Sequence, residues 1–183
     1  VTGSTDPGAR VYVTVIDDLG MSVTGVNVTA DSLGGFITSI DVSSLTDGPL
    51  TLTAITTDIA GNRNDFAVDL TMDTNPPIVS IFTPIAEDNV INDEEVSAVA
   101  LSGQAEPSTS VSVTVSDGIR SVMVSVPTDA NGIWNATMNL GALSAGTLIV
   151  QARNLDAAGN SATSSTQVTR TTGAISINLP VAG

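Results

Sequence analysis

The chain repeats itself, and this repeat constrains its fold more than any other feature. The sequence Asp-Ile-Ala-Gly-Asn at residues 58–62 returns as Asp-Ala-Ala-Gly-Asn at residues 156–160, 98 positions later. Phe36 and Trp134 are separated by the same 98 positions. Self-similarity at a fixed period indicates copies of one structural unit. Because the period is about a hundred residues, the unit has the size of a β-sandwich domain rather than of a solenoid turn.

Each copy has the pattern of short β-strands. Val111, Val113 and Val115 alternate with Ser and Thr, which is the two-residue period of a strand with one buried face. Val, Ile and Thr also favour strands intrinsically. The sequence therefore predicts an all-β chain of tandem immunoglobulin-like sandwiches, arranged end to end, with about seven strands each in a Greek key. In the second copy we expect strands at 77–83, 99–104, 110–115, 122–126, 134–140, 148–152 and 162–169.

The repeat predicts three segments: a first domain at 1–75, a complete second domain at 76–172 and a terminal segment at 173–183. The first copy lacks a counterpart of residues 77–100, whereas residues 174–180 resemble the strand segment 78–84. One interpretation is that this fragment has arbitrary boundaries within a longer chain. The other is that the terminal segment of one copy supplies the missing strand of another copy by β-strand addition.

The charge of the chain excludes several classes of partner. There are 19 Asp and Glu residues against 5 Lys and Arg, which gives a formal net charge of −14. Nucleic acids and anionic membranes need a basic surface, so we expect neither as a partner. The sequence also has no apolar run long enough to insert into a membrane. No signal peptide opens it, so we expect it to be part of something longer.

The residue types needed for most catalysis are missing. The chain has no His, no Cys and no Lys, so Ser-His, Cys-His and Schiff-base chemistry are excluded. Paired carboxylates can hydrolyse glycosides, but one Trp and one Tyr are too few to line a sugar cleft. Trp134 aligns with Phe36, so we interpret it as a core residue. We therefore expect no enzyme activity.

Clustered carboxylates leave one kind of chemistry open, the ligation of calcium by oxygen atoms. The loops 58–62 and 156–160 each supply a carboxylate, an amide and a glycine, although such a loop by itself is more often a hydrogen-bonded Asx turn. Acidic residues are also dense at 69–77 and 87–95, where the alternative is a solvated connector with a short helical turn. We expect Asp58, Asp73 and part of 88–94 to converge at the junction between the copies.

Several motifs together resemble bacterial immunoglobulin-like repeats of large secreted surface adhesins and biofilm-associated proteins. They are Gly-x-Ala-Glu-Pro at 103–107, Asp-x-Asn-Gly-x-Trp at 129–134, the two Asp-x-Ala-Gly-Asn loops and Asp-Thr-x-x-Pro at 73–77. The resemblance covers essentially the whole chain. It implies a non-enzymatic extender on the bacterial cell surface, with neighbouring repeats of the same chain as partners and calcium stiffening the joints. The candidate calcium ligands are then Asp58, Asp73, Asp88, Asp93 and Asp156.

Two alternative functions stay open. The first is a self-complementing fibre subunit that assembles by strand donation through the segment 173–183. The second is a terminal module that binds a glycan or a receptor, for which Tyr12 is the candidate on an outer face. One departure from the repeat also matters, because residues 168–173 lack the Asp and the double proline of the first exit. We therefore expect one well-formed joint, between the two copies.

Overall fold

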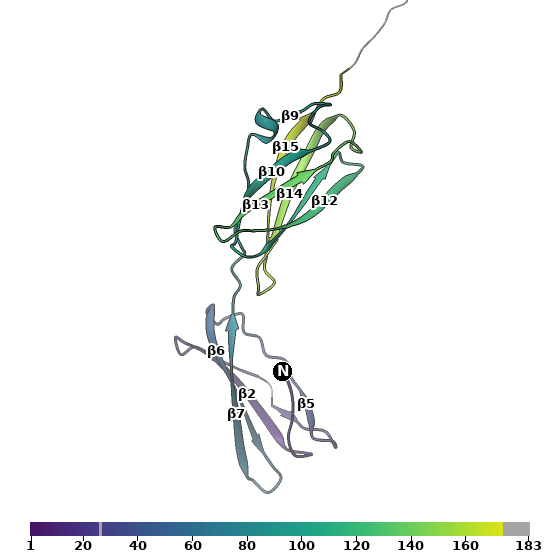
Figure 1. The fold of residues 1–183 in the computed structure, drawn as a ribbon. Coiled ribbons are helices and arrows are strands. Elements are labelled where there is room, and N and C mark those ends of the chain that lie inside the picture. The colour runs from purple at the N-terminus through teal and green to yellow at the C-terminus, as the bar shows by residue number, and fades with distance from the viewer. Residues whose placement is uncertain (26, 174–183) are drawn as a thin grey trace, which may run out of the picture. The chain divides into compact units, whose positions relative to one another are not determined.

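The structure is a computed structural model and describes residues 1–25 and 27–173. The chain divides into two compact units, Val1–Thr74 and Asn75–Gly183. Both units consist of β-strands (Figure 1), and the described residues contain one short 3₁₀ turn but no α-helix. No helix among these residues has the length and apolar character needed to cross a bilayer. The strand expected within 174–180 lies outside the described residues.

The second unit is a sandwich of two sheets whose inner faces share one core. Its smaller sheet has the order β13-β10-β8, and its larger sheet has the order β12-β11-β14-β15-β9. All neighbouring strands are antiparallel except β15 and β9, which are parallel. The strands are β8 (Val79–Ile81), β9 (Val90–Ile91), β10 (Val99–Ala105), β11 (Ser110–Ser116), β12 (Ser121–Pro127), β13 (Ile133–Met138), β14 (Gly146–Leu155) and β15 (Ser161–Arg170).

The alternating valines of the second unit pack as their period predicts. Val111, Val113 and Val115 are fully buried and face Trp134 and Leu101 of the other sheet across one continuous cluster. Trp134 has 0% of its surface exposed, so its interpretation as a core residue is confirmed. All seven strands expected in this unit are present, and the all-β sandwich fold is confirmed with them.

The connector between β8 and β10 has the short helical turn of the alternative interpretation, as the 3₁₀ turn η1 (Ile85–Glu87). It also has a strand that was not expected, β9, which pairs with the end of β15, so the connector is not simply solvated. Ile85 and Ile91 are 2% and 0% exposed and belong to the core cluster. Burial of an isoleucine side chain contributes roughly 1.5–3 kcal/mol, which outweighs the acidic character of the neighbouring residues.

The first unit repeats this plan in shorter form. One sheet has the order β3-β2-β6-β7, with β4 also paired to β2, and the other consists of β1 and β5 alone. Its core is built by Val11, Val13 and Val15 with leucines and an alanine from neighbouring segments. Its strands are β1 (Thr2–Ser4), β2 (Arg10–Asp17), β3 (Ser22–Thr24), β4 (Val28–Thr29), β5 (Gly35–Ile37), β6 (Gly48–Thr57) and β7 (Arg63–Met72).

The two units differ on one side of the sandwich. In the second unit β8, η1 and β9 cover that side, and Ile85 and Ile91 enter the core from it. Within the part of the chain that the structure describes, the first unit has no segment in these places, and β1 pairs with β5 only. Its sandwich is therefore open where the second is closed.

Candidate functional site

The two repeated loops hold themselves together by their own aspartates. Asp58 accepts a hydrogen bond of 2.8 Å from the backbone N–H of Asn62 and one of 2.7 Å from its side-chain amide. Asp156 accepts the same pair of bonds, both 2.8 Å long, from Asn160. Gly61 turns the first of these loops with a φ of 90°, which an L-residue adopts only at a cost. Both loops are therefore hydrogen-bonded Asx turns.

The pKa values of these two carboxyl groups reflect that role. The side-chain and backbone hydrogen bonds from Asn62 lower the pKa of Asp58 below its ordinary value. At Asp156 burial acts to raise the pKa, but the hydrogen bonds from Asn160 and its neighbours outweigh it and lower the pKa. Both side chains are therefore ionised at neutral pH, and each carboxylate accepts hydrogen bonds from its own loop.

Asp58 and Asp73 do not converge, and the expectation that they would is wrong. Asp58 lies in the loop that precedes β7, whereas Asp73 directly follows the last residue of β7, Met72. A strand of ten residues spans about 30 Å at roughly 3.3 Å per residue. The two carboxylates thus lie at opposite ends of the first unit and cannot share a cation.

The second unit separates its candidates in the same way. Asp156 lies just before the start of β15. Asp88 accepts a 2.8 Å hydrogen bond from the backbone N–H of Val90, the first residue of β9. Because β9 pairs with the other end of β15, the two aspartates lie at opposite ends of this strand. Asp93 accepts a 2.9 Å bond from the backbone N–H of Gly173, at that same far end. In the described ranges, no three acidic side chains gather in a group that could hold a metal ion. The five candidates therefore do not form a single centre.

A different pair of aspartates, Asp17 and Asp117, accepts long-range hydrogen bonds that their matching positions in the repeat did not predict. Asp117 accepts bonds from the backbone N–H groups of Ile119 and Arg120 and, through its second oxygen, from that of Ser144. The bonds from Arg120, Ser144 and Ile119, in this order of effect, hold the pKa of Asp117 well below its ordinary value. The signal that marks this position is that Asp17 occupies it in the first copy.

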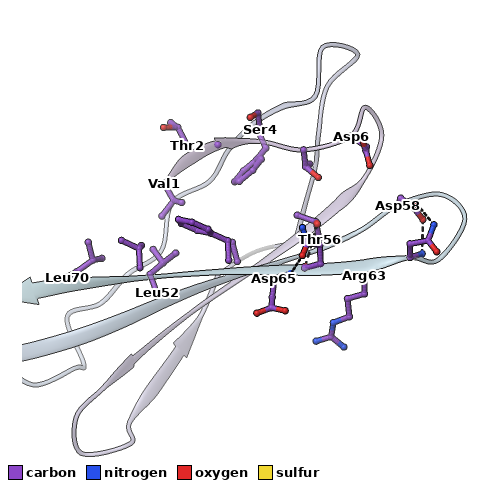
Figure 2. A pocket seen from close by; sticks show the side chains of 18 residues that line it. Val1, Thr2, Ser4, Asp6, Leu52, Thr56, Asp58, Arg63, Asp65 and Leu70 are labelled. Atoms are coloured by element: carbon purple, nitrogen blue, oxygen red, sulfur yellow. Dashed lines mark hydrogen bonds between the residues drawn. The ribbon is translucent and has the colours of Figure 1, made fainter.

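The first unit carries an open apolar groove along the side where it lacks covering strands. The groove has a volume of about 800 Å³ and runs between β1 and β5 on one wall and β6 and β7 on the other. Figure 2 shows Leu52 and Leu70 toward one end of it and Asp58 at the other. Along β7, Phe66, Val68 and Leu70 are 66%, 39% and 44% exposed. Large apolar side chains thus line an unfilled space.

A second hollow lies next to this groove. It has a volume of about 520 Å³ and is lined by apolar side chains such as Val15, Ile40 and Met72. Val1, Leu52 and Leu70 line both hollows, so the two adjoin. Monomeric proteins rarely leave contiguous apolar surface of this kind uncovered.

Comparisons with known proteins agree with the fold. Residues 83–171 match the family model described as bacterial Ig-like domain. A tetra-tandem repeat from the extending region of a large adhesion protein is 27% identical with a TM-score of 0.47, over 93% of this chain and 44% of that one. A Ca²⁺-stabilized adhesin that helps an Antarctic bacterium bind ice is 24% identical with a TM-score of 0.50, over 94% of this chain and 43% of that one.

A third similar structure, a bacterial immunoglobulin-like domain from the M. primoryensis ice-binding adhesin, is 28% identical with a TM-score of 0.37. It covers 54% of this chain and 98% of that domain. The chain spans less than half the length of the first two structures. No curated protein matches it. Residues 83–171, which make up most of the second unit, thus form a bacterial Ig-like domain.

Proposed function

We propose that the chain is a non-enzymatic structural extender of a bacterial cell-surface adhesin, displayed outside the cell. The observation that carries the proposal is the tandem repeat itself, with its second copy in the bacterial Ig-like family. The similar structures, which include an extending region of a large adhesion protein, support it. The partners of such a unit are the neighbouring repeats of the same chain.

The path of the chain through the second unit suits this role. The chain enters this unit at β8, whose first residue, Val79, lies opposite Ala105. At this same end of the sandwich the Asp156 loop joins β14 to β15. The chain leaves after Arg170, at the opposite end, where β15 pairs with β9. A repeat whose entrance and exit lie at opposite ends adds its full length to the protein. The double proline at 76–77 restricts the backbone just before this unit, which reduces bending there.

Calcium binding at the joint is a separate part of the proposal. The net charge of −14 favours cations, and one similar structure is described as a Ca²⁺-stabilized adhesin. Among the described residues, no group of three or more acidic side chains is placed so that it could hold a metal ion. A calcium ion, which takes six to eight oxygens, would therefore need roughly half of them or more from amides, carbonyls and water. Asp73 is the ligand that we propose to test first.

Thermal unfolding with millimolar calcium and with a chelator tests the calcium part. A tenfold excess of calcium over its dissociation constant stabilises the bound form by about 1.4 kcal/mol, so we expect the Tm to rise by several degrees. Asp73→Ala should abolish this rise, whereas the matched control Asp58→Ala should retain it. An identical Tm in calcium and in chelator would remove calcium from the proposal and leave the extender role standing.

Small-angle scattering tests the extender role itself. The expected result is a maximum dimension close to two sandwich lengths, which grows by one length when a further copy of residues 76–172 is appended. A compact particle whose maximum dimension does not increase with the added copy would overturn the proposal. The measurement is made in calcium and in chelator, so that its outcome is independent of the ion.

A second candidate function, assembly by strand donation through residues 173–183, stays a prediction, because residues 174–183 lie outside the described part of the chain. For the third function, a terminal binding module, Tyr12 was the candidate; its hydroxyl lies 3.3 Å from that of Thr24, to which it donates a hydrogen bond. Nothing in the described residues favours that function further.

A further inference from the structure

Strand β12 of the second unit is an edge strand of the larger sheet (Figure 1). It pairs with β11 on one side, and within the described ranges no strand pairs with its other side. Such an edge presents unpaired backbone N–H and C=O groups, which are a template for another strand. Charged residues and proline commonly block an edge, but the strand has no charged residue and only Pro127, at its last position.

The hydrogen bonds to β11 show which backbone groups of β12 point toward the free side. The backbone N–H of Thr128 donates a 3.0 Å bond to the carbonyl oxygen of Thr109 at one end of this ladder. At the other end the backbone N–H of Asp117 donates to the carbonyl oxygen of Arg120. Hydrogen-bonded positions alternate in an antiparallel pair, so the even-numbered residues of β12 bond to β11. The odd-numbered residues from 121 to 125 therefore point their N–H and C=O groups to the free side.

The corresponding edge of the first unit is interrupted. There Val23 of β3 lies opposite Val15, and Val28 of β4 lies opposite Val11. Val28 comes five positions after Val23, whereas Val11 comes four positions before Val15, and one extra residue on the edge is the count of a β-bulge. Bulges turn an edge away from further pairing. The second unit lacks this protection, because β12 pairs with β11 without interruption from residue 121 to residue 127.

The side chains of β12 are incompletely covered on both faces of the sheet. Val122, Val124 and Val126 pack against the core cluster but are only partly buried, whereas the three valines of the neighbouring strand β11 are fully buried. On the outer face Met123 is 71% exposed. A further strand beside β12 would remove apolar surface from water on both faces, which favours the pairing.

We propose that β12 pairs with β12 of a second copy of the chain, so that the two larger sheets join into one across a two-fold axis. The sequence of β12, Ser-Val-Met-Val-Ser-Val-Pro, is self-complementary in antiparallel orientation. With Val124 on the axis, Val122 lies opposite Val126 of the second copy, and Met123 lies opposite Ser125. These contacts are reciprocal, as a two-fold interface requires. The contact joins separate chains side by side, and it therefore goes beyond the extender role, whose partners are neighbouring repeats of one chain.

The charges at the two ends of β12 favour the antiparallel orientation. Arg120 precedes the strand, whereas Asp129 lies two residues after it. Glu106 also lies at that end, where its carbonyl oxygen accepts a 2.7 Å bond from the hydroxyl of Thr128. Antiparallel pairing places Arg120 of each copy opposite Thr128 of the other, beside the acidic end, whereas parallel pairing would bring like charges together. The uncharged strand between these ends lets two copies of net charge −14 meet without opposed side-chain charges.

Sedimentation equilibrium of the whole chain over a range of protein concentrations tests the association. We expect a reversible equilibrium between monomer and dimer without larger species, because two-fold pairing consumes the edge. Ser125→Pro should give a monomer, because it removes an N–H that points to the free side and takes no part in the pairing with β11. Ser125→Ala is the matched control, since it loses the same hydroxyl but keeps the N–H, and it should dimerise like the wild type. The Tm and the fluorescence of Trp134 check that both variants are folded.

Disulfide formation tests the register, because the chain has no cysteine. Val124→Cys should give the most covalent dimer, since the two thiols face each other in a pair whose Cα atoms are about 4.5 Å apart. Met123→Cys should give less, because its two copies are diagonal neighbours at roughly 7–8 Å. Ser121→Cys should give none, because its two copies are six residues out of register, about 20 Å apart. Chance collisions would instead favour the exposed positions 121 and 123 over the partly buried position 124.

Three outcomes would overturn the proposal. The first is a chain that stays monomeric up to its highest soluble concentration. The second is a dimer whose dissociation constant is the same for Ser125→Pro as for Ser125→Ala, which would place the contact elsewhere. The third is a disulfide yield that is highest at residue 121, which would contradict the register. The scattering test of the extender role is made on the Ser125→Pro variant, so that failure of either idea is seen separately.

Discussion

Asp117 accepts a hydrogen bond of 2.7 Å from the backbone N–H of Ser144, 27 residues further along the chain. In the first copy Asp17 accepts one of 3.1 Å from Thr46, which is 29 residues away. The other oxygen of each aspartate closes the turn that follows it. In each copy, one aspartate therefore links its hairpin turn to a later loop. This loop precedes β6 in the first unit and β14 in the second.

The first prediction concerns the pH dependence of this tie. Because the pKa of Asp117 lies below the ordinary value of 3.8, its contribution to stability is present in full above that pH and is lost as the pH falls through the folded-state pKa. Asp117→Asn should therefore lower the Tm by roughly 4–8 °C at pH 7. The difference from the wild type should shrink as the pH falls below about 4.

Fluorescence of the single tryptophan, Trp134, follows this transition in the second unit. Glu106→Gln removes the same charge from that unit and serves as the control; its Tm should stay within about a degree of the wild type. A difference between Asp117→Asn and the wild type that stayed constant down to pH 2 would show that the ionised carboxylate is not what stabilises the tie.

The second prediction concerns Trp134. Replacement by Ala should lower the free energy of unfolding by about 3–5 kcal/mol, because the side chain is fully buried and leaves a cavity. Trp134→Phe, which introduces the residue of the first copy, should cost far less. The indole Nε1 of Trp134 has no hydrogen-bond partner among the described residues, so the phenyl ring also removes a buried donor.

Urea unfolding followed by circular dichroism measures both Trp134 variants, since neither retains the tryptophan. Ile119→Ala, at a side chain that is 90% exposed, is the control and should change the free energy of unfolding by less than about 0.5 kcal/mol. Equal losses for Trp134→Phe and Trp134→Ala would contradict this account of the core.

The third prediction concerns the close approach of β8 to β10. Gly103→Ala should destabilise the second unit by about 1–3 kcal/mol, because the new methyl group forces β8 or Trp134 to move. Gly173→Ala is the control, since a Cβ atom there meets only the carboxylate of Asp93 at an ordinary 3.7 Å. The midpoint of urea unfolding reports both, and an unchanged midpoint for Gly103→Ala would mean that β8 does not seat there.

The fourth prediction separates turn formation from metal binding. Asp58→Asn and Asp156→Asn weaken the bonds that close their own loops, so each should lower the Tm by a few degrees. The decrease should be the same in calcium and in chelator, because each carboxylate is engaged within its loop. A decrease seen only in calcium would instead identify that aspartate as a ligand. Differential scanning calorimetry under the two conditions provides the measurement.

The sequence by itself determined the all-β fold and the position of most strands. The valine alternation at 111–115 and the spacing of the repeat reflect backbone preference and the burial of one strand face. Both depend on neighbouring residues, so both can be recognised from the sequence. The core role of Trp134 followed in the same way from its alignment with Phe36. The paired aspartates Asp17 and Asp117 were visible in the repeat, but their long-range bonds to Thr46 and Ser144 were not.

Only the tertiary structure decided which side chains meet. It separated Asp58 from Asp73 because the two ends of one ten-residue strand are about 30 Å apart, a distance that spacing in the sequence does not reveal. It brought Ile91 of an acidic connector into the core, because the exposed edge of β15 offered a pairing site and an apolar interior beside it.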